Sequence, residues 1–240
     1  MNRSHNEVAV ITGGSAGLGL ALTEELVDRG WSVVTDARDA DRLHAALPNS
    51  PRVTSLAGDV RDRDHQDAIA AAVARHGRLD LLVHNASDLG PMLPLAEATA
   101  NHLSTVLETN LIGPLTLTQR LLPYLIASRG TLVGISSDAA VEHYPTWGTY
   151  AASKAALDHL ILTLGEENGI SAYAVDPGDM RTAMHQAAFP GEDISDRPLP
   201  ESVVPHLLGL LAAGPASGRY QAADFSLEAD ASSLSNGATR

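Results

Sequence analysis

The chain contains no cysteine among its 240 residues, and aromatic residues make up only 4% of it. The absence of cysteine excludes a disulfide framework, a thiol nucleophile and a zinc–thiolate site. No run approaches the roughly 18 apolar residues of a membrane span, and residues 1–7 are polar and lack the hydrophobic centre of a signal peptide. These absences predict a soluble, cytoplasmic protein with no membrane partner.

Positive charge is also scarce, since 16 Lys and Arg residues face 29 Asp and Glu residues for a net charge of −13. Binding to a phosphate backbone depends on clusters of Lys and Arg, so we expect no nucleic-acid partner.

Apolar residues at 44% are enough to fill a sizeable core, and no linker rich in proline or serine divides the chain. Residues 1–240 are therefore predicted to form one domain.

Short apolar runs alternate with stretches of helical spacing along the whole chain. Such alternation predicts an α/β fold with a doubly wound, mostly parallel seven-stranded sheet and helices on both faces. The expected strands are 8–12, 32–36, 53–57, 80–84, 130–136, 170–175 and 219–222. The expected helices are 18–29, 39–47, 62–76, 100–111, 114–128, 149–167 and 201–213.

A glycine-rich loop, Gly13-Gly14-Ser15-Ala16-Gly17-Leu18-Gly19, lies between the first expected strand and the first expected helix. Glycines in this position permit a tight turn and let backbone N–H groups approach a pyrophosphate, which a helix N-terminus also favours. The context predicts a dinucleotide site, although glycine-rich loops also occur as plain turns.

Tyr150 and Lys154 are four residues apart, which places both side chains on one face of a helix. An ammonium beside a phenol favours the phenolate, so this spacing predicts a lowered Tyr150 pKa and proton transfer near neutral pH. Ser137 follows an expected strand thirteen residues before the tyrosine, where its hydroxyl can hold a substrate oxygen. Taken alone, a tyrosine and a lysine at this spacing are more often an ordinary pair on a surface helix.

Six motifs occur together in a familiar order: Thr12-Gly13-x-x-x-Gly17-x-Gly19, Asn85-Ala86, Asn110, Ser137, Tyr150-x-x-x-Lys154 and Pro177-Gly178. On these motifs, over about residues 6–222, the chain resembles the shorter branch of the short-chain dehydrogenase/reductase family. The resemblance implies a Rossmann-type fold and an oxidoreductase that transfers hydride between a nicotinamide cofactor and a small carbonyl or alcohol.

The resemblance also implies a role for each residue of the reacting centre. Tyr150 corresponds to the acid/base, Ser137 to the anchor of the carbonyl oxygen, and Lys154 to the charge that lowers the tyrosine pKa and contacts the nicotinamide ribose. Asn110 corresponds to a residue that bends its helix and holds a water between the lysine and solvent. A purely structural asparagine is the alternative for Asn110.

By the same resemblance, Asp59-Val60 lies beside the adenine, Asn85-Ala86 lies in the middle of the cleft, and the segment 177–182 covers the nicotinamide. For Asp59 a helix cap is the alternative. The expected cofactor-binding residues are Gly13, Ser15, Ala16, Gly17, Leu18, Gly19, Arg38, Asp59, Val60, Asn85, Ala86, Tyr150, Lys154, Pro177, Gly178 and Thr182.

The choice between NADP and NAD depends on the end of the second expected strand. An acid there bonds the adenosine ribose and selects NAD, whereas an arginine accommodates the 2′-phosphate of NADP. Alignment with similar reductases puts Ala37 in the place of the acid and Arg38 after it, which favours NADP. Ala16 replaces a basic residue common in NADP members, and Asp36 would repel a phosphate, so NAD remains the alternative.

Residues 180–200 lack a clear period and contain three prolines and a glycine, which predicts an irregular loop that acts as a substrate lid. The pocket is expected to mix apolar and aromatic side chains with a few polar groups. Its expected residues are Ser87, His143, Trp147, Met180 and Met184. No metal site is predicted, because neither His143 nor His185 has a second ligand at suitable spacing.

The expected helices 114–128 and 149–167 hold more apolar residues than one buried stripe needs. In similar proteins these helices pair between subunits, so a homodimer or homotetramer is expected. Residues 224–240 are rich in serine and are predicted to be disordered.

Three functions compete on this evidence. The first is an NADP-dependent reductase, the second an NAD-dependent alcohol dehydrogenase of the same family, and the third a cofactor-binding redox sensor or scaffold without catalysis. The set Asn110, Ser137, Tyr150 and Lys154 argues against a scaffold, which has no need of all four.

Overall fold

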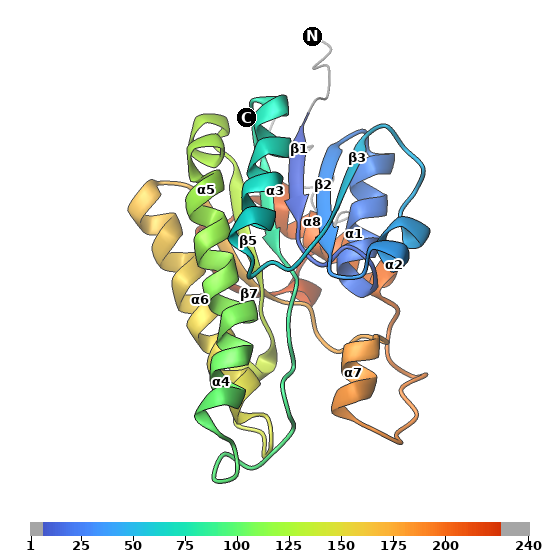
Figure 1. The fold of residues 1–240 in the computed structure, drawn as a ribbon, viewed down its shortest axis with the longest axis vertical. Helices are drawn as coiled ribbons and strands as arrows, with labels where there is room; N and C mark the ends of the chain where they lie inside the picture. Colours follow the sequence, from blue (N-terminus) through green and yellow to red (C-terminus); the bar gives the residue numbers. More distant parts are fainter. Residues whose placement is uncertain (1–6, 227–240) are drawn as a thin grey trace, which may run out of the picture.

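A computed structural model describes residues 7–226 of the chain. Within this range seven parallel strands form one sheet in the order β3-β2-β1-β4-β5-β6-β7 (Figure 1). The strands are β1 (Val8–Ile11), β2 (Ser32–Ala37), β3 (Val53–Ala57), β4 (Leu81–His84), β5 (Thr131–Ile135), β6 (Ser171–Asp176) and β7 (Gly218–Gln221).

The strand order reverses between β1 and β4, which are neighbours in the sheet although about 70 residues separate them in the chain. Ile11 pairs with Val83, so the segments that follow the two strands lie beside each other. In open parallel sheets ligands bind outside the carboxyl ends of the strands at such a reversal. The fold therefore brings the glycine-rich loop and Asn85-Ala86 to one place.

Helices cover both faces of the sheet (Figure 1). Apolar residues of α1 and α8 pack on one face, and those of α3, α5 and α6 pack on the other. The helices are α1 (Gly17–Asp28), α2 (Ala40–Ala46), α3 (Arg63–His76), α4 (Ala100–Leu107), α5 (Gly113–Ser128), α6 (Gly148–Asn168), α7 (Ala183–Ala188) and α8 (Pro200–Ala213).

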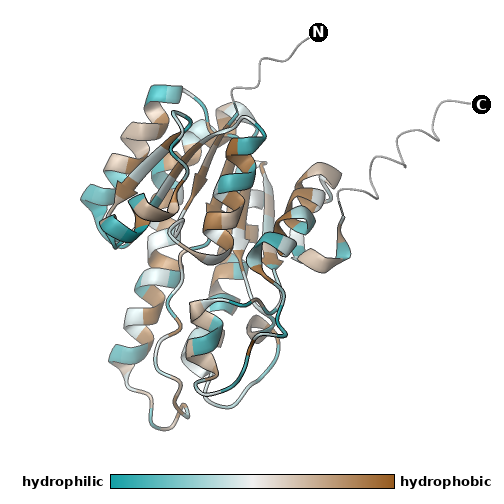
Figure 2. Cartoon of the chain, turned by 90° about the vertical axis from the view of Figure 1, so that its right-hand side faces the viewer, coloured by the Kyte–Doolittle hydropathy of each residue, from teal (hydrophilic) through white to brown (hydrophobic). Residues whose placement is uncertain are grey.

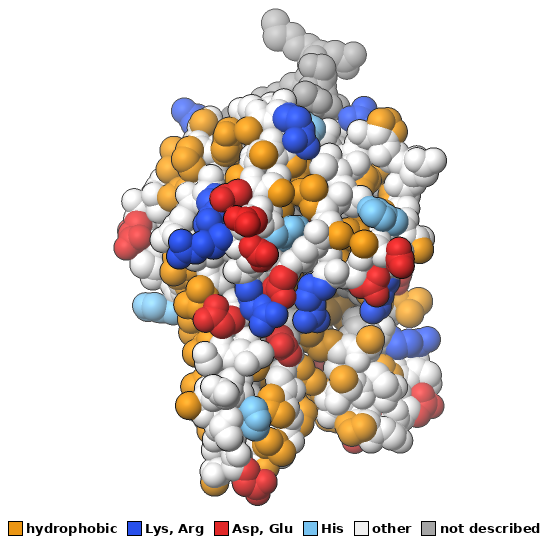
Figure 3. Space-filling model, viewed as in Figure 1, with side chains coloured by type: hydrophobic (Ala, Val, Ile, Leu, Met, Phe, Trp, Pro, Cys, Tyr) orange, Lys and Arg blue, Asp and Glu red, His pale blue; other side chains and the backbone are white. Residues whose placement is uncertain are grey.

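The central strands are buried on both faces. Every residue of β1 and β4 is buried, which explains their continuous apolar runs. Figure 2 shows hydrophobic residues along the strands and hydrophilic residues on the outer turns of the helices. On the face drawn in Figure 3, acidic and basic side chains lie side by side across the middle of the molecule.

The predicted α/β class, the seven strands and the seven predicted helices are confirmed, with bounds that differ by one or two residues in most cases. The predicted break after residue 111 is wrong. A π-helical turn, Glu108–Ile112, joins α4 to α5, so the helical segment is continuous from 100 to 128. Pro114 lies in the first turn of α5, directly after the π-helical turn.

The predicted irregular loop over 180–200 contains a short helix, α7. Thr182 caps this helix by accepting the His185 main-chain N–H at 3.1 Å. None of the α7 residues is buried, so the helix has no apolar stripe from which its period could be recognised. Figure 1 shows α7 beyond the carboxyl ends of the strands.

The predicted disordered tail begins too early. Asp224 ends a short 3₁₀ turn, and Phe225 packs against the core cluster formed with α1 and α8, while residues 227–240 lie outside the described range. Among residues 7–226, no helix is long and apolar enough to cross a membrane.

His84 at the end of β4 gives the fold a testable pH dependence. Its Nε2 lies 2.7 Å from Thr118 Oγ1, and burial lowers the pKa of His84 from 6.5 to about 3. Between these two values the unfolded chain binds a proton that the folded chain does not, so the free energy of unfolding falls as the pH is lowered from 6.5 toward 3. His84→Gln removes this proton and is expected to flatten the dependence by up to about 1.4 kcal/mol per pH unit. Urea unfolding at pH 7, 6 and 5 measures the difference, and parallel curves for the two proteins would contradict it.

Candidate active site

The glycine-rich loop packs closely against the end of β4. Gly13 and Gly17 have positive φ angles of 76° and 57°, which favour glycine. A Cβ on Gly19 would lie 2.4 Å from the Asn85 Nδ2 atom and from the Gly13 carbonyl oxygen. Asn85 Nδ2 donates to the Thr12 carbonyl (2.8 Å), and Thr12 Oγ1 accepts the Asn85 main-chain N–H (3.0 Å). Gly19 is buried and does not line the cleft, which corrects its predicted contact with a cofactor.

Replacing Gly19 with alanine is expected to destabilise the protein by about 1–3 kcal/mol, the usual cost of overpacking a tight contact. The added methyl group would have to displace Asn85 or the Gly13 backbone, and both hold the loop against β4. Urea unfolding measures the loss. An unchanged unfolding midpoint would mean that the loop relaxes freely and that the close approach is unimportant.

The loop leaves the N-terminus of α1 open to the cleft. Ala16 at the N-cap makes no side-chain hydrogen bond, and the first turn carries no acidic residue. Ser15, Ala16, Gly17 and Leu18 all line the cleft. Unsatisfied N–H groups at a helix N-terminus favour an anion.

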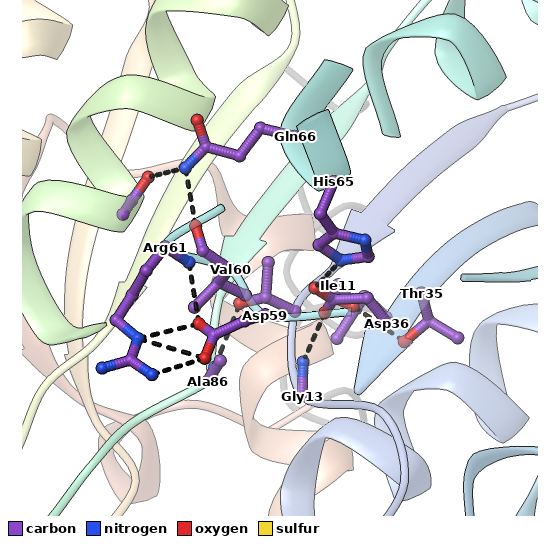
Figure 4. A network of polar contacts seen from close by, with 12 residues as sticks. Ile11, Gly13, Thr35, Asp36, Asp59, Val60, Arg61, His65, Gln66 and Ala86 are labelled. Carbon is purple, nitrogen blue, oxygen red and sulfur yellow. Dashed lines mark hydrogen bonds and ion pairs between the residues drawn. The ribbon is translucent and has the colours of Figure 1, made fainter. Parts of the chain in front are cut away.

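Asp36 at the end of β2 points into the protein (Figure 4). Its Oδ1 accepts the Gly13 N–H at 2.9 Å, its Oδ2 lies 2.9 Å from His65 Nε2, and its side chain is 1% exposed. A Cβ on Gly58 would lie 2.1 Å from His65 Nδ1, so a glycine at 58 makes room for this ring. Arg38, two residues beyond Asp36, is exposed and lines the same cleft.

Asp59 forms a two-pronged ion pair with Arg61 (Figure 4). A hydrogen bond from Arg61 lowers the pKa of Asp59 below its ordinary value, and the charge of Arg38 adds to this. The alternative prediction that Asp59 caps the following helix is wrong, because Asp62 caps α3 by accepting the Asp64 N–H at 2.8 Å. Asp59 and Val60 both line the cleft.

Ser137, Tyr150 and Lys154 meet in the same cleft, as the sequence predicts. Ser137 lies two residues after β5, at the cap of the 3₁₀ helix Asp138–Ala140, and the other two side chains lie one turn apart on α6. The Ser137 hydroxyl donates to Asp138 Oδ1 (2.9 Å), and Lys154 Nζ donates to the Ile135 carbonyl (2.7 Å). Lys154 is 2% exposed, and burial lowers its pKa to about 8.

The predicted lowering of the Tyr150 pKa is wrong for this chain. Burial raises the pKa of Tyr150 to about 12, while hydrogen bonds with Ser137 and Ser87 oppose the rise. Lys154 Nζ lies 5.6 Å from the centre of the Tyr150 ring, and the loss of water around the phenol is the largest influence on its pKa. Tyr150 is consequently a protonated phenol at neutral pH.

Asn110 lies in the π-helical turn with its amide fully hydrogen-bonded to protein. Oδ1 accepts from the Asp88 N–H (2.7 Å) and the Ser87 hydroxyl (3.2 Å), and Nδ2 donates to the Asp88 carbonyl (2.9 Å) and Ser153 Oγ (2.9 Å). These bonds tie the loop after β4 to α6, which supports the predicted bend in the helix. The side chain is buried, and its hydrogen-bonding groups are all paired with protein groups.

The cleft has a volume of about 790 Å³ and runs from Arg38 past the glycine-rich loop to the segment 180–200. Thr182 lies against Gly17, where a Cβ would come within 3.4 Å of its methyl group. Phe189 of this segment contacts the Trp147 ring, with the ring centres 5.8 Å apart. The segment 180–200 therefore contacts both the glycine-rich loop and the aromatic wall of the cleft.

Four of the five predicted substrate-pocket residues line the cleft, namely Ser87, Trp147, Met180 and Met184. His143 does not, and the prediction for it is wrong. The Tyr144 hydroxyl donates to Asp138 Oδ2 (2.8 Å), and this bond holds the loop so that Trp147 faces the cleft and His143 lies in solvent.

The sequence interpretation did not single out Asp138, His65 or Arg219. Asp138 could have been recognised from its position directly after Ser137. His185, a residue of the expected loop 180–200, lines the cleft from α7. His65 and Arg219 contact the site from distant segments and gave no signal in the sequence.

Residues 7–193 match a protein-family model described as short chain dehydrogenase. The chain is 32% identical over 186 residues to an uncharacterised oxidoreductase of Schizosaccharomyces pombe, covering 77% of this chain and 75% of that protein. It is 31% identical over 188 residues to the L-fucose dehydrogenase of Mus musculus, covering 77% of this chain and 69% of the relative. A solved structure of a short chain dehydrogenase from Shigella flexneri 2a str. 301, complexed with NADP, has a TM-score of 0.81 and 27% identity, and the match covers 90% of this chain and 97% of that one.

Proposed function

Because the chain belongs to the short-chain dehydrogenase/reductase family of oxidoreductases, we propose that it transfers hydride between NADP and a carbonyl or alcohol, with Tyr150 as acid/base. The family uses a nicotinamide cofactor and small-molecule substrates. The observation that carries the proposal is that Ser137, Tyr150, Lys154 and the glycine-rich loop all line one cleft.

The residues of the cleft fit a dinucleotide. The uncapped N-terminus of α1 suits a pyrophosphate, and the positive φ angles of Gly13 and Gly17 form the tight turn that leads to it. Asp59, Val60 and Ala86 would hold the adenosine end, and Pro177, Gly178 and Thr182 the nicotinamide end. When bound, the nicotinamide supplies or accepts the hydride.

The chain's own residues handle the proton. The Ser137 hydroxyl would donate a hydrogen bond to the substrate carbonyl oxygen, and Tyr150 would donate its phenolic proton to the same oxygen as negative charge develops there. Lys154 places a buried ammonium over the Tyr150 ring, which stabilises the phenolate left after proton transfer. Tyr150 is protonated at neutral pH and can therefore serve as the proton donor in carbonyl reduction.

Two features of this chain support NADP over NAD. Arg38 is exposed at the nucleotide end of the cleft, and the acidic residue beside it, Asp36, is turned inward onto Gly13 and His65. A structural neighbour complexed with NADP adds support. Asp36 still lines the cleft, so an NAD-dependent alcohol dehydrogenase is the competing reading.

Parallel fluorescence titrations with NADPH and NADH test the proposal. Tighter binding of NADPH, followed by turnover in a screen of ketones, aldehydes and quinones, is the expected result. The similarity to an L-fucose dehydrogenase is a reason to include sugars in the screen. Tighter NADH binding would contradict the role of Arg38. If neither nucleotide bound, the proposal of an enzyme would fail, and a non-catalytic scaffold would be the better explanation.

We also propose that the enzyme is a homodimer or homotetramer that pairs through α5 and α6, and that residues 180–200 act as the substrate lid. Ile112 and Ile126, at the two ends of the α5 segment, are large exposed hydrophobic residues. Light scattering during size-exclusion chromatography measures the assembly. The cytoplasmic location stays a prediction.

A further inference from the structure

Four charged side chains gather around the reacting residues, and two of them, Lys154 and Asp176, also line the cleft. Lys154 and Asp158 come from successive turns of α6, Asp176 ends β6, and Arg219 lies on the edge strand β7. All are largely buried: the side chains of Asp176, Asp158 and Arg219 are 7%, 12% and 24% exposed. Buried charges are costly unless they are paired, so the cluster demands an explanation.

Arg219 joins the three segments that shape the reacting end of the site. One terminal nitrogen donates to the Ser137 carbonyl at 2.9 Å and lies 3.5 Å from Asp176 Oδ2. Its Nε donates to Asp158 Oδ2 at 3.1 Å. Asp176 also accepts the Gly178 N–H through Oδ1 at 3.0 Å, which shapes the turn after β6.

This pattern differs from an ordinary ion pair. A surface pair joins two side chains and contributes little, whereas this guanidinium binds one main-chain carbonyl and two carboxylates on separate elements. The planar fork of arginine is suited to several fixed acceptors at once, and a lysine ammonium cannot reproduce it. The carbonyl belongs to the residue whose hydroxyl faces the substrate.

We propose that Arg219 is a positioning residue of the active site, which holds Ser137 against α6 and the β6 turn and balances the charge of Asp158 next to Lys154. This inference rests on the proposed function, because Arg219 would act only by positioning Ser137 and by balancing the charge near Lys154. It assigns no contact between Arg219 and substrate or cofactor.

The charge balance around Lys154 gives the inference a specific consequence. Its charged and titratable neighbours are Tyr150 and Asp158 on its own helix, Asp176 on β6 and Arg219 on β7. Burial lowers the pKa of Lys154, and the charge of Asp158 opposes this. Without Arg219, the Asp158 carboxylate would lose its cationic partner. Its negative charge would then stabilise the protonated form of Lys154 more strongly, so the Lys154 pKa would rise.

The titration of Lys154 can be measured directly, because it is the only lysine in the chain. Protein labelled with ¹³C in lysine has a single lysine side-chain signal, and its chemical shift against pH should show a midpoint near 8. In Arg219→Gln the midpoint should move upward, and in Arg219→Gln combined with Asp158→Asn it should return downward. Arg120→Gln is the matched control, because Arg120 forms an arginine–aspartate pair with Asp67 between α5 and α3. The Lys154 signal of Arg120→Gln should have the same titration midpoint as that of the unmodified protein.

Turnover provides the second readout. Misplacing a substrate-holding group by a small distance can reduce kcat by about 10²-fold, and we expect a loss of this order in Arg219→Gln with little change in NADPH affinity. Arg219→Lys should recover only part of kcat, because it keeps the positive charge and loses the planar fork. It also serves as the deciding variant if Arg219→Gln does not fold.

An unchanged Lys154 midpoint in Arg219→Gln would overturn the inference, as would lowered stability with normal kcat and normal titration. The lysine titration needs no substrate or cofactor. If the protein turned over no carbonyl compound, the proposed function would fail, and the titration would still decide whether Arg219 controls the charge at Lys154.

Discussion

Replacing Tyr150 with phenylalanine is expected to lower kcat for carbonyl reduction by roughly 10²- to 10⁴-fold, the usual contribution of a positioned acid. The phenol is buried beside Ser137 and stays protonated because its pKa is raised to about 12. Phenylalanine removes the proton donor but keeps the ring that packs against Trp147, with ring centres 5.8 Å apart. The protein should therefore remain folded and still bind NADPH. Steady-state kinetics with the best carbonyl substrate, a thermal melt and a nucleotide titration measure the three quantities.

Tyr220→Phe is the matched control for loss of a phenolic hydroxyl. The Tyr220 hydroxyl donates to the Ala216 carbonyl at 2.7 Å, and the residue does not line the cleft. This variant should keep normal kcat. Near-normal turnover in Tyr150→Phe would exclude Tyr150 as the acid, whereas equal losses in both variants would point to a general effect on stability.

Replacing Arg38 with glutamine is expected to weaken NADPH binding by about 10- to 100-fold, because a charge-assisted hydrogen bond to a phosphate contributes about 1.5–3 kcal/mol. NADH lacks the 2′-phosphate, so its affinity should change little. Arg38 is exposed, and salt weakens exposed charge pairs, so the titrations belong at low ionic strength. The ratio of the two dissociation constants is the decisive measurement.

Two further variants control this result. Arg29→Gln removes one positive charge outside the cleft, where Arg29 pairs with Glu25 at 2.7 Å, and should leave both affinities unchanged. Asp36→Asn removes the acidic charge while keeping an oxygen that can accept the Gly13 N–H. If Asp36→Asn changes the nucleotide preference and Arg38→Gln does not, the acid rather than the arginine selects the cofactor.

Much of the fold could be predicted because its signals are local. The buried strands are short apolar runs, and three helices end where a glycine takes the left-handed conformation, at Gly77, Gly169 and Gly214. The predictions of secondary structure were wrong where no local signal in the sequence marked the element. The exposed helix α7 has no buried stripe, and the π-helical turn around Asn110 depends on bonds to Asp88 and Ser153 from other segments.

The meeting of the reacting residues was also predictable from sequence. In a parallel sheet the carboxyl ends of all strands lie at one edge, so Ser137 after β5 and the loop after β1 had to share that edge. Helical spacing placed Tyr150 and Lys154 on the same side of α6. These relations follow from chain order and backbone geometry, which the sequence by itself determined.

Only the tertiary structure decided the electrostatics of the site. The Tyr150 pKa rises instead of falling because burial by many surrounding atoms outweighs one lysine at helical spacing. Asp36 turns inward because His65, 29 residues away, meets it, and Ser137 is held by Arg219, 82 residues away. Desolvation and long-range pairing depend on every group that packs around a charge, and such groups come from segments whose proximity no local pattern encodes.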